Sequence, residues 1–254
     1  MAEPPKSPTF TEFIAFRLKP SVKPEEGESN REGEQLLDFF RETMLQSGHL
    51  GSAWGRTLED ENVVIWVIGS PLPFFLLSRL SIYEWSDSSN STPLSRLDPF
   101  IDYSNSDDPT TLLTFYSTLS PSISESDTLT TNPITELVTV AVPSDISPDN
   151  HKQFNNDQLA FRDALLNKAT PESVRPITWA RGQIERPAEF EHQDSPSGKA
   201  LVYLNVIGWK SREQHTQARD TKAFAETIEP LRKRVLMPVK GMDMKHVKFQ
   251  KIGF

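Results

Sequence analysis

The sequence predicts an α+β protein built from two ferredoxin-like βαββαβ repeats whose antiparallel sheets bury each other's apolar faces. Short segments recur in the same order in the two halves of the chain, and the strand-like and helix-like patterns recur with them. Residues 11–18 return as residues 135–142, and Trp54-Gly55-Arg56 returns as Trp179-Ala180-Arg181. A sheet with one apolar face needs a partner to cover it, and the simplest partner for each copy is its twin.

The first repeat is predicted over residues 9–119, after a disordered arm at residues 1–8. Alternating apolar residues predict strands and a 3.6-residue spacing predicts helices. The strands are expected at about 10–18, 50–58, 62–69 and 110–119, and the helices at about 30–47 and 87–103. This order of elements is that of the split βαβ, ferredoxin-like arrangement.

Residues 69–83 interrupt the correspondence between the two repeats. The centre of this insertion is the run Ser70-Pro71-Leu72-Pro73-Phe74-Phe75-Leu76-Leu77-Ser78. The run could be an apolar lid over a pocket, or an extra element packed on the sheets. It could also be a translated intron tract, because Ser, Pro, Leu and Phe can all be encoded with pyrimidines in their first two codon positions. A spliced message that lacks these codons would support the last interpretation.

A Ser-rich polar linker is predicted at residues 120–132, and the second repeat at residues 133–254. The expected strands lie at about 134–142, 174–185 and 199–208, with a last strand that carries Val247 and Phe249. The expected helices lie at about 149–167 and 211–234. Ser211 and Gln214 have the spacing of a capping box, which indicates that the second helix begins there.

The composition excludes several classes of function. The chain has 254 residues, no cysteine and a net charge of −8. Disulfides and thiolate metal sites are therefore excluded, and a cytoplasmic location is predicted. The negative charge disfavours nucleic-acid partners. No apolar run approaches the roughly 20 residues of a membrane helix, so no membrane partner is expected. We expect a monomer (a pseudo-dimer) or a weak homodimer.

The most motif-like segment is Gly208-Trp209-Lys210-Ser211-Arg212-Glu213-Gln214-His215. Helical spacing places His215 on the face turned toward the sheet. An imidazole at the edge of a buried surface can act as a general base near neutral pH. The alternative is a structural histidine that is hydrogen-bonded to a backbone carbonyl.

Two further pairs of side chains are candidates for binding. Trp179 and Arg181 share one face of a strand, where the arginine could bind an enolic oxygen or form a cation–π pair that stabilises the sheet. Tyr203 and Asn205 share a face of the next strand and need polar partners, from a ligand or from the core. The five histidines show no metal-ligand spacing, and no phosphate loop, nucleophile elbow or dinucleotide turn is found. No metal or cofactor is therefore predicted.

The doubled unit, together with Trp209, Ser211, Glu213, His215 and Phe224, resembles the dimeric α+β barrel superfamily, in its antibiotic-biosynthesis-monooxygenase-like branch. The resemblance implies that two four-stranded antiparallel sheets face each other as one barrel, with the helices outside. The superfamily includes cofactor-free oxygenases of aromatic polyketides, polyketide cyclases, isomerases, haem-degrading enzymes and proteins without known activity. The fold therefore transfers better than the function.

The sequence thus predicts a cofactor-independent enzyme, an oxygenase or a cyclase, that acts on an aromatic or polyketide-like small molecule. Its pocket is expected between the sheet and the helices of the second repeat, lined by Trp179, Arg181, Tyr203, Asn205, Trp209 and His215. His215 would take a proton from the substrate and Arg181 would stabilise the resulting enolate, while the other four bind the substrate. The alternative is a non-catalytic barrel that binds a small molecule or serves protein association.

Overall fold

The computed structural model describes residues 9–46, 49–70, 94–105, 107–123, 128–167 and 170–252. The strands are β1 (Phe10–Arg17), β2 (Gly51–Arg56), β3 (Val63–Ser70), β4 (Leu112–Ser117), β5 (Ile134–Pro143), β6 (Thr178–Arg186), β7 (Phe190–Glu191), β8 (Lys199–Trp209), β9 (Lys245–Val247) and β10 (Gln250–Lys251). The α-helices are α1 (Arg31–Met44), α3 (Thr128–Thr131), α4 (Pro148–Leu166), α5 (Arg212–Arg219) and α6 (Lys222–Arg232). Short 3-10 helices lie at η1 (Pro24–Ser29), η2 (Leu94–Leu97) and η3 (Glu172–Val174). We call the part from β1 to β4 the first half, and the part from β5 onward the second half.

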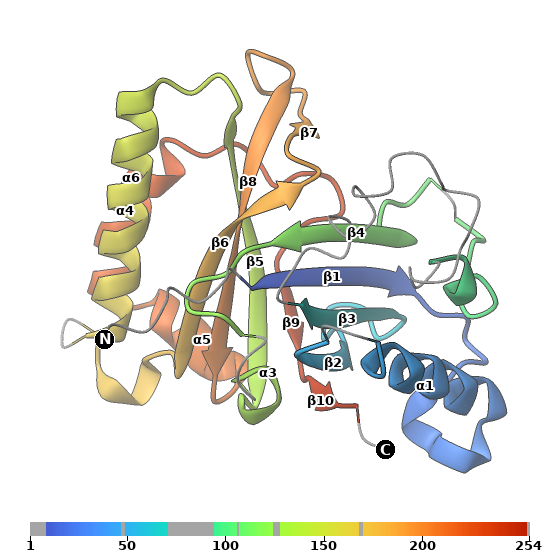
Figure 1. The fold of residues 1–254 in the computed structure, drawn as a ribbon. Coiled ribbons are helices and arrows are strands. Elements are labelled where there is room, and N and C mark those ends of the chain that lie inside the picture. The colour runs from blue at the N-terminus through green and yellow to red at the C-terminus, as the bar shows by residue number, and fades with distance from the viewer. Residues whose placement is uncertain are drawn as a thin grey trace, which may run out of the picture.

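The strands form one curled antiparallel sheet in which both halves have the same strand order. The first half runs β2-β3-β1-β4 and the second half runs β6-β8-β5-β9. The halves join where β4 pairs with β6, with Ser117 opposite Ile184. They join again at the C-terminal segment, because β9 pairs with β5 and β10 pairs with β2. In Figure 1 the strands of the second half run up the picture and those of the first half run across it.

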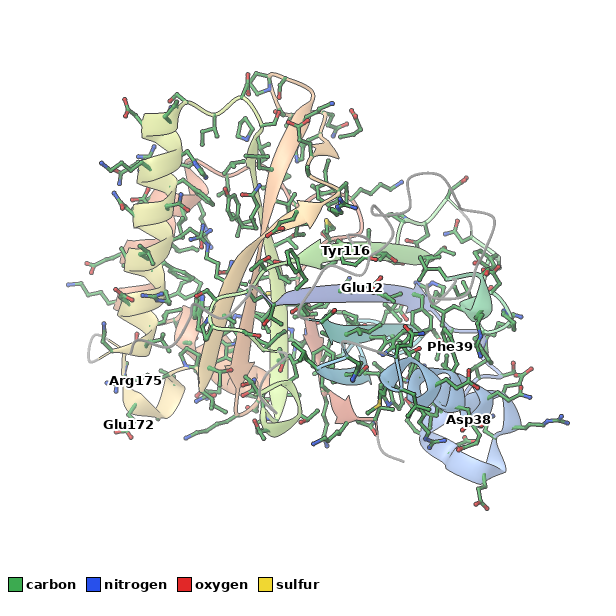
Figure 2. The ribbon with its side chains drawn as sticks, viewed as in Figure 1. Glu12, Asp38, Phe39, Tyr116, Glu172 and Arg175 are labelled. Atoms are coloured by element: carbon green, nitrogen blue, oxygen red, sulfur yellow. The ribbon has the colours of Figure 1, made fainter. Side chains whose placement is uncertain are left out.

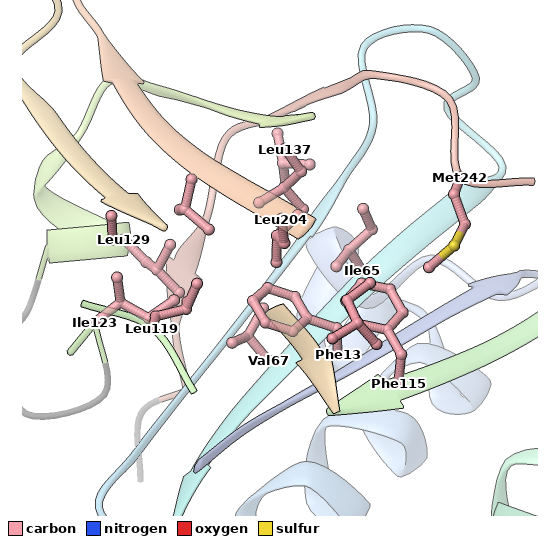
Figure 3. Packing of buried hydrophobic residues seen from close by; sticks show 14 of the residues in the cluster. Phe13, Ile65, Val67, Phe115, Leu119, Ile123, Leu129, Leu137, Leu204 and Met242 are labelled. Carbon is pink, nitrogen blue, oxygen red and sulfur yellow. The ribbon is translucent and has the colours of Figure 1, made fainter. Parts of the chain in front are cut away.

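One apolar core lies between the two halves. The rings of Phe13 and Phe115, from the first half, stack with their centroids 5.1 Å apart. They belong to the same buried cluster as Leu137 and Leu204 of the second half (Figure 3). Each fully buried side chain of this kind contributes about 1.5–3 kcal/mol relative to an exposed one. The apolar faces of the two halves therefore cover each other, as the sequence led us to expect.

The outer face of the first half is closed by aromatic side chains. Helix α1 carries Phe39 and Phe40, and the Phe40 ring lies 4.3 Å from that of Trp66 on β3. The side chain of Trp66 is fully buried, and its indole N–H donates to Ser52 at 2.7 Å. Figure 2 shows Phe39 on α1, on the side of the molecule away from α4. The Trp66 indole therefore packs directly against the aromatic side chains of α1.

The two joins between the halves are each made possible by a glycine. A β-carbon on Gly182 would lie 2.1 Å from the Thr118 carbonyl oxygen, and one on Gly55 would lie 2.4 Å from the Lys248 carbonyl oxygen. Both obstacles are backbone atoms, which cannot move aside without disturbing the strand pairing.

We therefore expect Gly182→Ala to lower the free energy of unfolding by about 1–3 kcal/mol or more, the usual cost of overpacking. Urea unfolding measures the change. Gln183→Ala, at the next position of β6, adds no atom at this join and should cost less. A Gly182→Ala protein as stable as the wild type would show that β4 and β6 do not approach so closely.

Three of the expected elements differ from the structure. Residues 94–103 of the expected helix 87–103 form only the short 3-10 helix η2 and a turn, while residues 71–93 lie outside the described residues. The expected helix 211–234 is divided into α5 and α6, because Thr221 caps a new helix by accepting from the Phe224 backbone N–H. The last strand is divided into β9 and β10, which pair with different halves.

The arm at residues 1–8 also lies outside the described residues, as does all of the insertion after Ser70. Among the described residues, no helix combines the length and the apolar character needed to cross a lipid bilayer. The architecture is thus an α+β fold with a curled antiparallel sheet and helices on its outer faces (Figure 1).

Candidate active site

A cavity of about 230 Å³ lies between the outer face of the sheet and the helices of the second half, where the sequence predicted a pocket. Most of its wall is apolar and comes from Val138, Val140, Phe161, Leu165, Ile207, Phe224, Ile228, Leu231, Val235 and Met244. Cavities for drug-sized ligands measure about 300–1,000 Å³. This smaller space suits a compact molecule of one or two rings.

Strand alternation and register bring the polar residues of the cavity to one face of the sheet. Glu136 on β5 lies opposite Ile207 on β8 and, on its other side, opposite His246 on β9. Trp179 on β6 also lies opposite Ile207. Side chains of directly opposed residues point to the same face. One row across four strands therefore carries Trp179, Ile207, Glu136 and His246 toward the helices.

Four of the six predicted site residues line this cavity: Trp179, Asn205, Trp209 and His215. Arg181 and Tyr203 share their strand face but do not line it. Arg181 lies over the Tyr203 ring, 5.0 Å from its centroid, and donates to Asn155 on α4 at 2.8 Å. The Tyr203 hydroxyl is hydrogen-bonded to His151 on α4 at 2.6 Å. Helix α4 therefore occupies this end of the sheet with its own polar side chains.

His215 is the centre of a buried polar cluster. Its Nδ1 lies 2.8 Å from Nε2 of His246, and its ring stacks on the Trp209 indole with centroids 4.8 Å apart. Its Nε2 lies 3.7 Å from Oε2 of Glu136. The Trp209 indole N–H donates to the same Glu136 oxygen at 2.8 Å. The imidazole is thus held from three sides.

The first half supplies the last member of this cluster. The Glu59 carboxylate accepts from the His246 backbone N–H at 2.8 Å and lies 2.7 Å from His246 Nδ1. Burial alone would raise the pKa of Glu59, but the backbone and side-chain hydrogen bonds from His246 hold it below its usual value. An ionised carboxylate can only accept. The proton between these two groups therefore sits on Nδ1 of His246. With that proton on Nδ1, Nε2 of His246 can accept from Nδ1–H of His215. This leaves Nε2 of His215 with a free lone pair.

Burial sets the protonation of the two inner groups. It raises the pKa of Glu136 to about 7, against the opposing effect of the hydrogen bond from Trp209. Burial lowers the pKa of His215 to about 4, and the positive charges of Arg219 and Arg212 act in the same direction. At neutral pH the imidazole of His215 is therefore uncharged, and the carboxyl of Glu136 exchanges its proton readily. A base and an acid face each other beside the cavity.

The raised pKa of Glu136 predicts a pH-dependent effect of Glu136→Gln on stability. A pKa that rises from 4.5 to about 7 on folding gives stability that is present below pH 4.5 and is lost as the pH rises through 7. Glutamine cannot ionise. Relative to the wild type, the variant should gain about 2–3 kcal/mol of unfolding free energy between pH 5 and pH 8.

Urea unfolding at both pH values measures this gain. Glu229→Gln, which removes an exposed carboxyl on α6, is the matched control and should show no such pH-dependent difference. Parallel stability curves for wild type and Glu136→Gln would contradict the assignment.

Glu136, His215 and His246 also offer metal-ligating atoms that all lie within 4.8 Å of one another. A transition metal needs its ligand atoms to converge at about 2.0–2.2 Å from one point. His246 approaches Nδ1 of His215, whereas Glu136 approaches Nε2. Glu136 and His246 therefore lie against opposite nitrogens of the imidazole and do not form a convergent ligand set.

Three buried polar atoms beside the cavity have no hydrogen-bond partner: Nε1 of Trp179, Nε2 of Gln158 and Oδ1 of Asn205. Their side chains line the cavity and are exposed by only 8%, 3% and 3%. Buried polar atoms in folded proteins are nearly always paired. Two donors and one acceptor are thus available to a ligand.

Solved structures share this fold, although no protein-family model matches the chain and no curated protein is similar to it in sequence. A candidate chlorite dismutase is 9% identical with a TM-score of 0.55, over 97% of this chain and 96% of that one. An anthrone oxidase-like protein is 12% identical with a TM-score of 0.53, over 97% and 94%. A candidate monooxygenase from Lactobacillus acidophilus is 10% identical with a TM-score of 0.50, over 97% of each chain.

These neighbours belong to the dimeric α+β barrel superfamily. The chain has the α+β barrel fold. At such low identity the likeness extends to the fold alone, so the chemistry of this barrel has to be argued from its own residues.

The sequence did not identify Gln158, Glu136, His246 or Glu59 as members of the barrel's site. The sequence did contain a signal for Glu136, because a carboxylate stands at this position inside an apolar strand. The corresponding strand of the first half carries Glu12 at the same position. There the Tyr116 hydroxyl, from the strand opposite, donates to Glu12 at 2.7 Å (Figure 2). Gln158 gave no signal, because a single glutamine on a mostly polar helix is ordinary.

Proposed function

We propose that the protein is a cofactor-independent enzyme that oxygenates or cyclises an aromatic or polyketide-like small molecule in the cavity of the second half. The observation that carries this proposal is a neutral imidazole with a free lone pair, His215, beside an apolar cavity that contains unpartnered polar atoms. The names of the structural neighbours, monooxygenase and anthrone oxidase-like, favour oxygenase chemistry.

In the proposed first step, Nε2 of His215 takes a proton from an acidic phenol or methylene group of the substrate. The imidazolium then keeps its Nδ1–H bond to His246, and Glu59 stabilises the positive charge from the far side. The hydrogen bonds that join His215, His246 and Glu59 spread the positive charge away from the apolar cavity. Burial holds the pKa of His215 at about 4, so protonating its imidazole costs free energy. The hydrogen bonds to His246 and Glu59 offset part of that cost.

The substrate anion then reacts without a further cofactor. In oxygenation, an activated CH₂ group reacts with O₂ and becomes a carbonyl, while the second oxygen atom and the two hydrogens leave as water, so no reductant is needed. In cyclisation, the carbanion forms a bond to a carbonyl carbon of the same molecule. Protonated Glu136 would donate a hydrogen bond to the oxygen on which negative charge develops.

The proposal keeps Trp179, Asn205 and Trp209 as cavity-lining residues and His215 as the base. It does not keep the roles first expected for Arg181 and Tyr203, because these side chains are engaged with α4 outside the lining. We assign oxyanion stabilisation to Glu136. The unpartnered polar atoms of Gln158, Trp179 and Asn205 would orient the substrate.

We also propose that the two halves are repeats of one unit, fused into an internal pseudo-dimer of the antibiotic-biosynthesis-monooxygenase-like branch. Their identical strand order supports this. So does the register, because Glu12 lies opposite Ile68 as Glu136 lies opposite Ile207. A protein expressed as separate halves that reassemble into the native barrel would support the proposal.

A non-catalytic binding protein is the second candidate, favoured by the lowered pKa of His215, which makes it a weak base. Incubation with naphthols, other one- and two-ring aromatics and short linear polyketide mimics separates the two, with oxygen uptake and product mass as readouts. More than one product molecule per protein supports an enzyme, while saturable binding without conversion supports the binder. Activity that survives chelation, in protein without a visible chromophore, supports cofactor independence, and activity lost on chelation overturns it.

A further inference from the structure

We infer that the ligand of this cavity is an aromatic hydroxy acid, with its hydroxyl against the buried polar atoms and its carboxylate at the arginines of the opening. The inference deepens the proposed function, because it names the substrate class of the same cavity. It rests on that function only for the choice of this cavity as the substrate site.

The inner polar atoms match a hydroxyl group. Nε1 of Trp179 and Nε2 of Gln158 are donors without an acceptor, and Oδ1 of Asn205 is an acceptor without a donor. A hydroxyl offers two lone pairs and one proton, which is the complement of this set. A carbonyl would leave Asn205 unpaired, and an amine, with at most one lone pair, would leave at least one of the two donors unpaired. A phenol hydroxyl is therefore the group that offers both an acceptor for the donors and a proton for Asn205.

The wall between the inner atoms and the opening suits an aromatic ring. Phe161, Ile207 and Phe224 belong to the apolar lining of the cavity, and the Phe161 ring meets Phe224 edge-on, with centroids 5.1 Å apart. The Phe161 ring also meets the Trp179 indole edge-on at 5.8 Å. A flat ring between such groups gains offset or edge-to-face contacts. The volume of about 230 Å³ limits the ligand to one or two rings.

The remaining charged lining residues point to an anion. Besides Glu136 and His215, the cavity is lined by Arg219 and Arg232, which end helices α5 and α6 and are exposed. Neither arginine forms an ion pair with a carboxylate in the described part of the chain, whereas Arg234 nearby is paired with Asp157 at 2.7 Å. A guanidinium binds a carboxylate through two parallel hydrogen bonds. Arg219 and Arg232 can therefore receive the acid group of a ligand.

The test compares 4-hydroxybenzoate and 6-hydroxy-2-naphthoate with their methyl esters and with benzoate and 2-naphthoate, by calorimetric titration of the full chain. We expect at least one hydroxy acid to bind, with its ester and its deoxy analogue each at least 10-fold weaker. Equal affinities across the three forms, or no binding of either hydroxy acid, would overturn the inference.

Single variants assign the two ends of the ligand. Arg219→Gln and Arg232→Gln should each weaken the acid several-fold and leave the ester unchanged, while Arg212→Gln, on α5 but outside the lining, should change neither. Gln158→Leu should weaken the hydroxy acid and not its deoxy analogue. If the arginine variants lost the same affinity for the acid and for its ester, the ligand carboxylate would not bind these arginines.

These tests distinguish a failure of the ligand class from a failure of the proposed function. A hydroxy acid that binds as described without conversion sustains the ligand class and refutes catalysis. Turnover of an uncharged substrate, with the acids no tighter than their esters, sustains catalysis and refutes the ligand class.

Discussion

Replacing His215 by asparagine is expected to reduce turnover by about 100- to 10,000-fold, the usual contribution of a general base, while the protein stays folded. The asparagine amide N–H can take the place of Nδ1–H toward His246, which stands 2.8 Å from that atom in the wild type. Asparagine has no lone-pair nitrogen at the position of Nε2, the atom that faces Glu136 and the cavity. The hydrogen-bonded chain is thus largely kept and the base is lost.

Initial rates and urea unfolding of the same preparations separate catalysis from folding. His192→Gln is a matched control, because His192 is also buried, with 7% exposure, and its Nε2 lies 2.9 Å from the Met237 carbonyl oxygen. It does not line the cavity, and glutamine can repeat its hydrogen bond, so the rate should be unchanged. If His215→Asn lowered stability while the folded fraction kept its turnover, His215 would be structural.

The position of the site could be predicted from the sequence because it depends on local patterns. Ser211 caps α5 by accepting from the Gln214 backbone N–H at 3.2 Å, as the capping-box spacing indicated. The helix therefore begins where expected, and its 3.6-residue period turns His215 and Ala218 toward the sheet, where both are buried. Strand alternation likewise placed Trp179 and Asn205 on the correct face.

The partners of His215 could not be predicted, because they depend on how distant segments meet. His246 lies 31 residues further along the chain, and Glu59 lies 187 residues before His246. Glu59 reaches the site because the last strand segment pairs with both halves, and no periodicity in the sequence encodes that crossing. The row of residues across β6, β8, β5 and β9 becomes visible only once the register is known.

Arg181 and Tyr203 lie outside the lining of the cavity for a related reason. Alternation correctly assigned their strand face, but it cannot tell which helix residue covers each position. Asn155 and His151 on α4 supply polar partners at that end, so a compact hydrogen-bonded and cation–π group forms there in place of a cavity wall. A strand face can thus hold a cavity and a filled region within two residues of each other.

Replacing Asn205 by tryptophan is expected to close the cavity and abolish ligand binding in a protein that still folds. The first half already contains this arrangement. Trp66 lies opposite Ile14 on β1 as Asn205 lies opposite Val138 on β5, and the Trp66 indole is fully buried against Phe40. The backbone of this fold therefore accepts an indole at the position, and the cavity of about 230 Å³ offers the space for one.

The free energy of unfolding of Asn205→Trp is also expected to stay close to that of the wild type. The substitution removes a buried acceptor that has no partner, which costs about 1–3 kcal/mol in the wild type, and it fills empty space. Misfit of the larger ring would cost about 1–3 kcal/mol. The two contributions are of similar size, so we expect the melting temperature to stay within a few degrees of the wild type.

Calorimetric titration with the hydroxy acids and thermal unfolding measure the two effects together. Asn205→Leu is the matched control, because it removes the same acceptor and leaves the cavity open, so weakened but measurable binding is expected. Wild-type affinity in Asn205→Trp would show that the ligand binds elsewhere, since an indole at this position and a ring in the cavity cannot occupy the same volume.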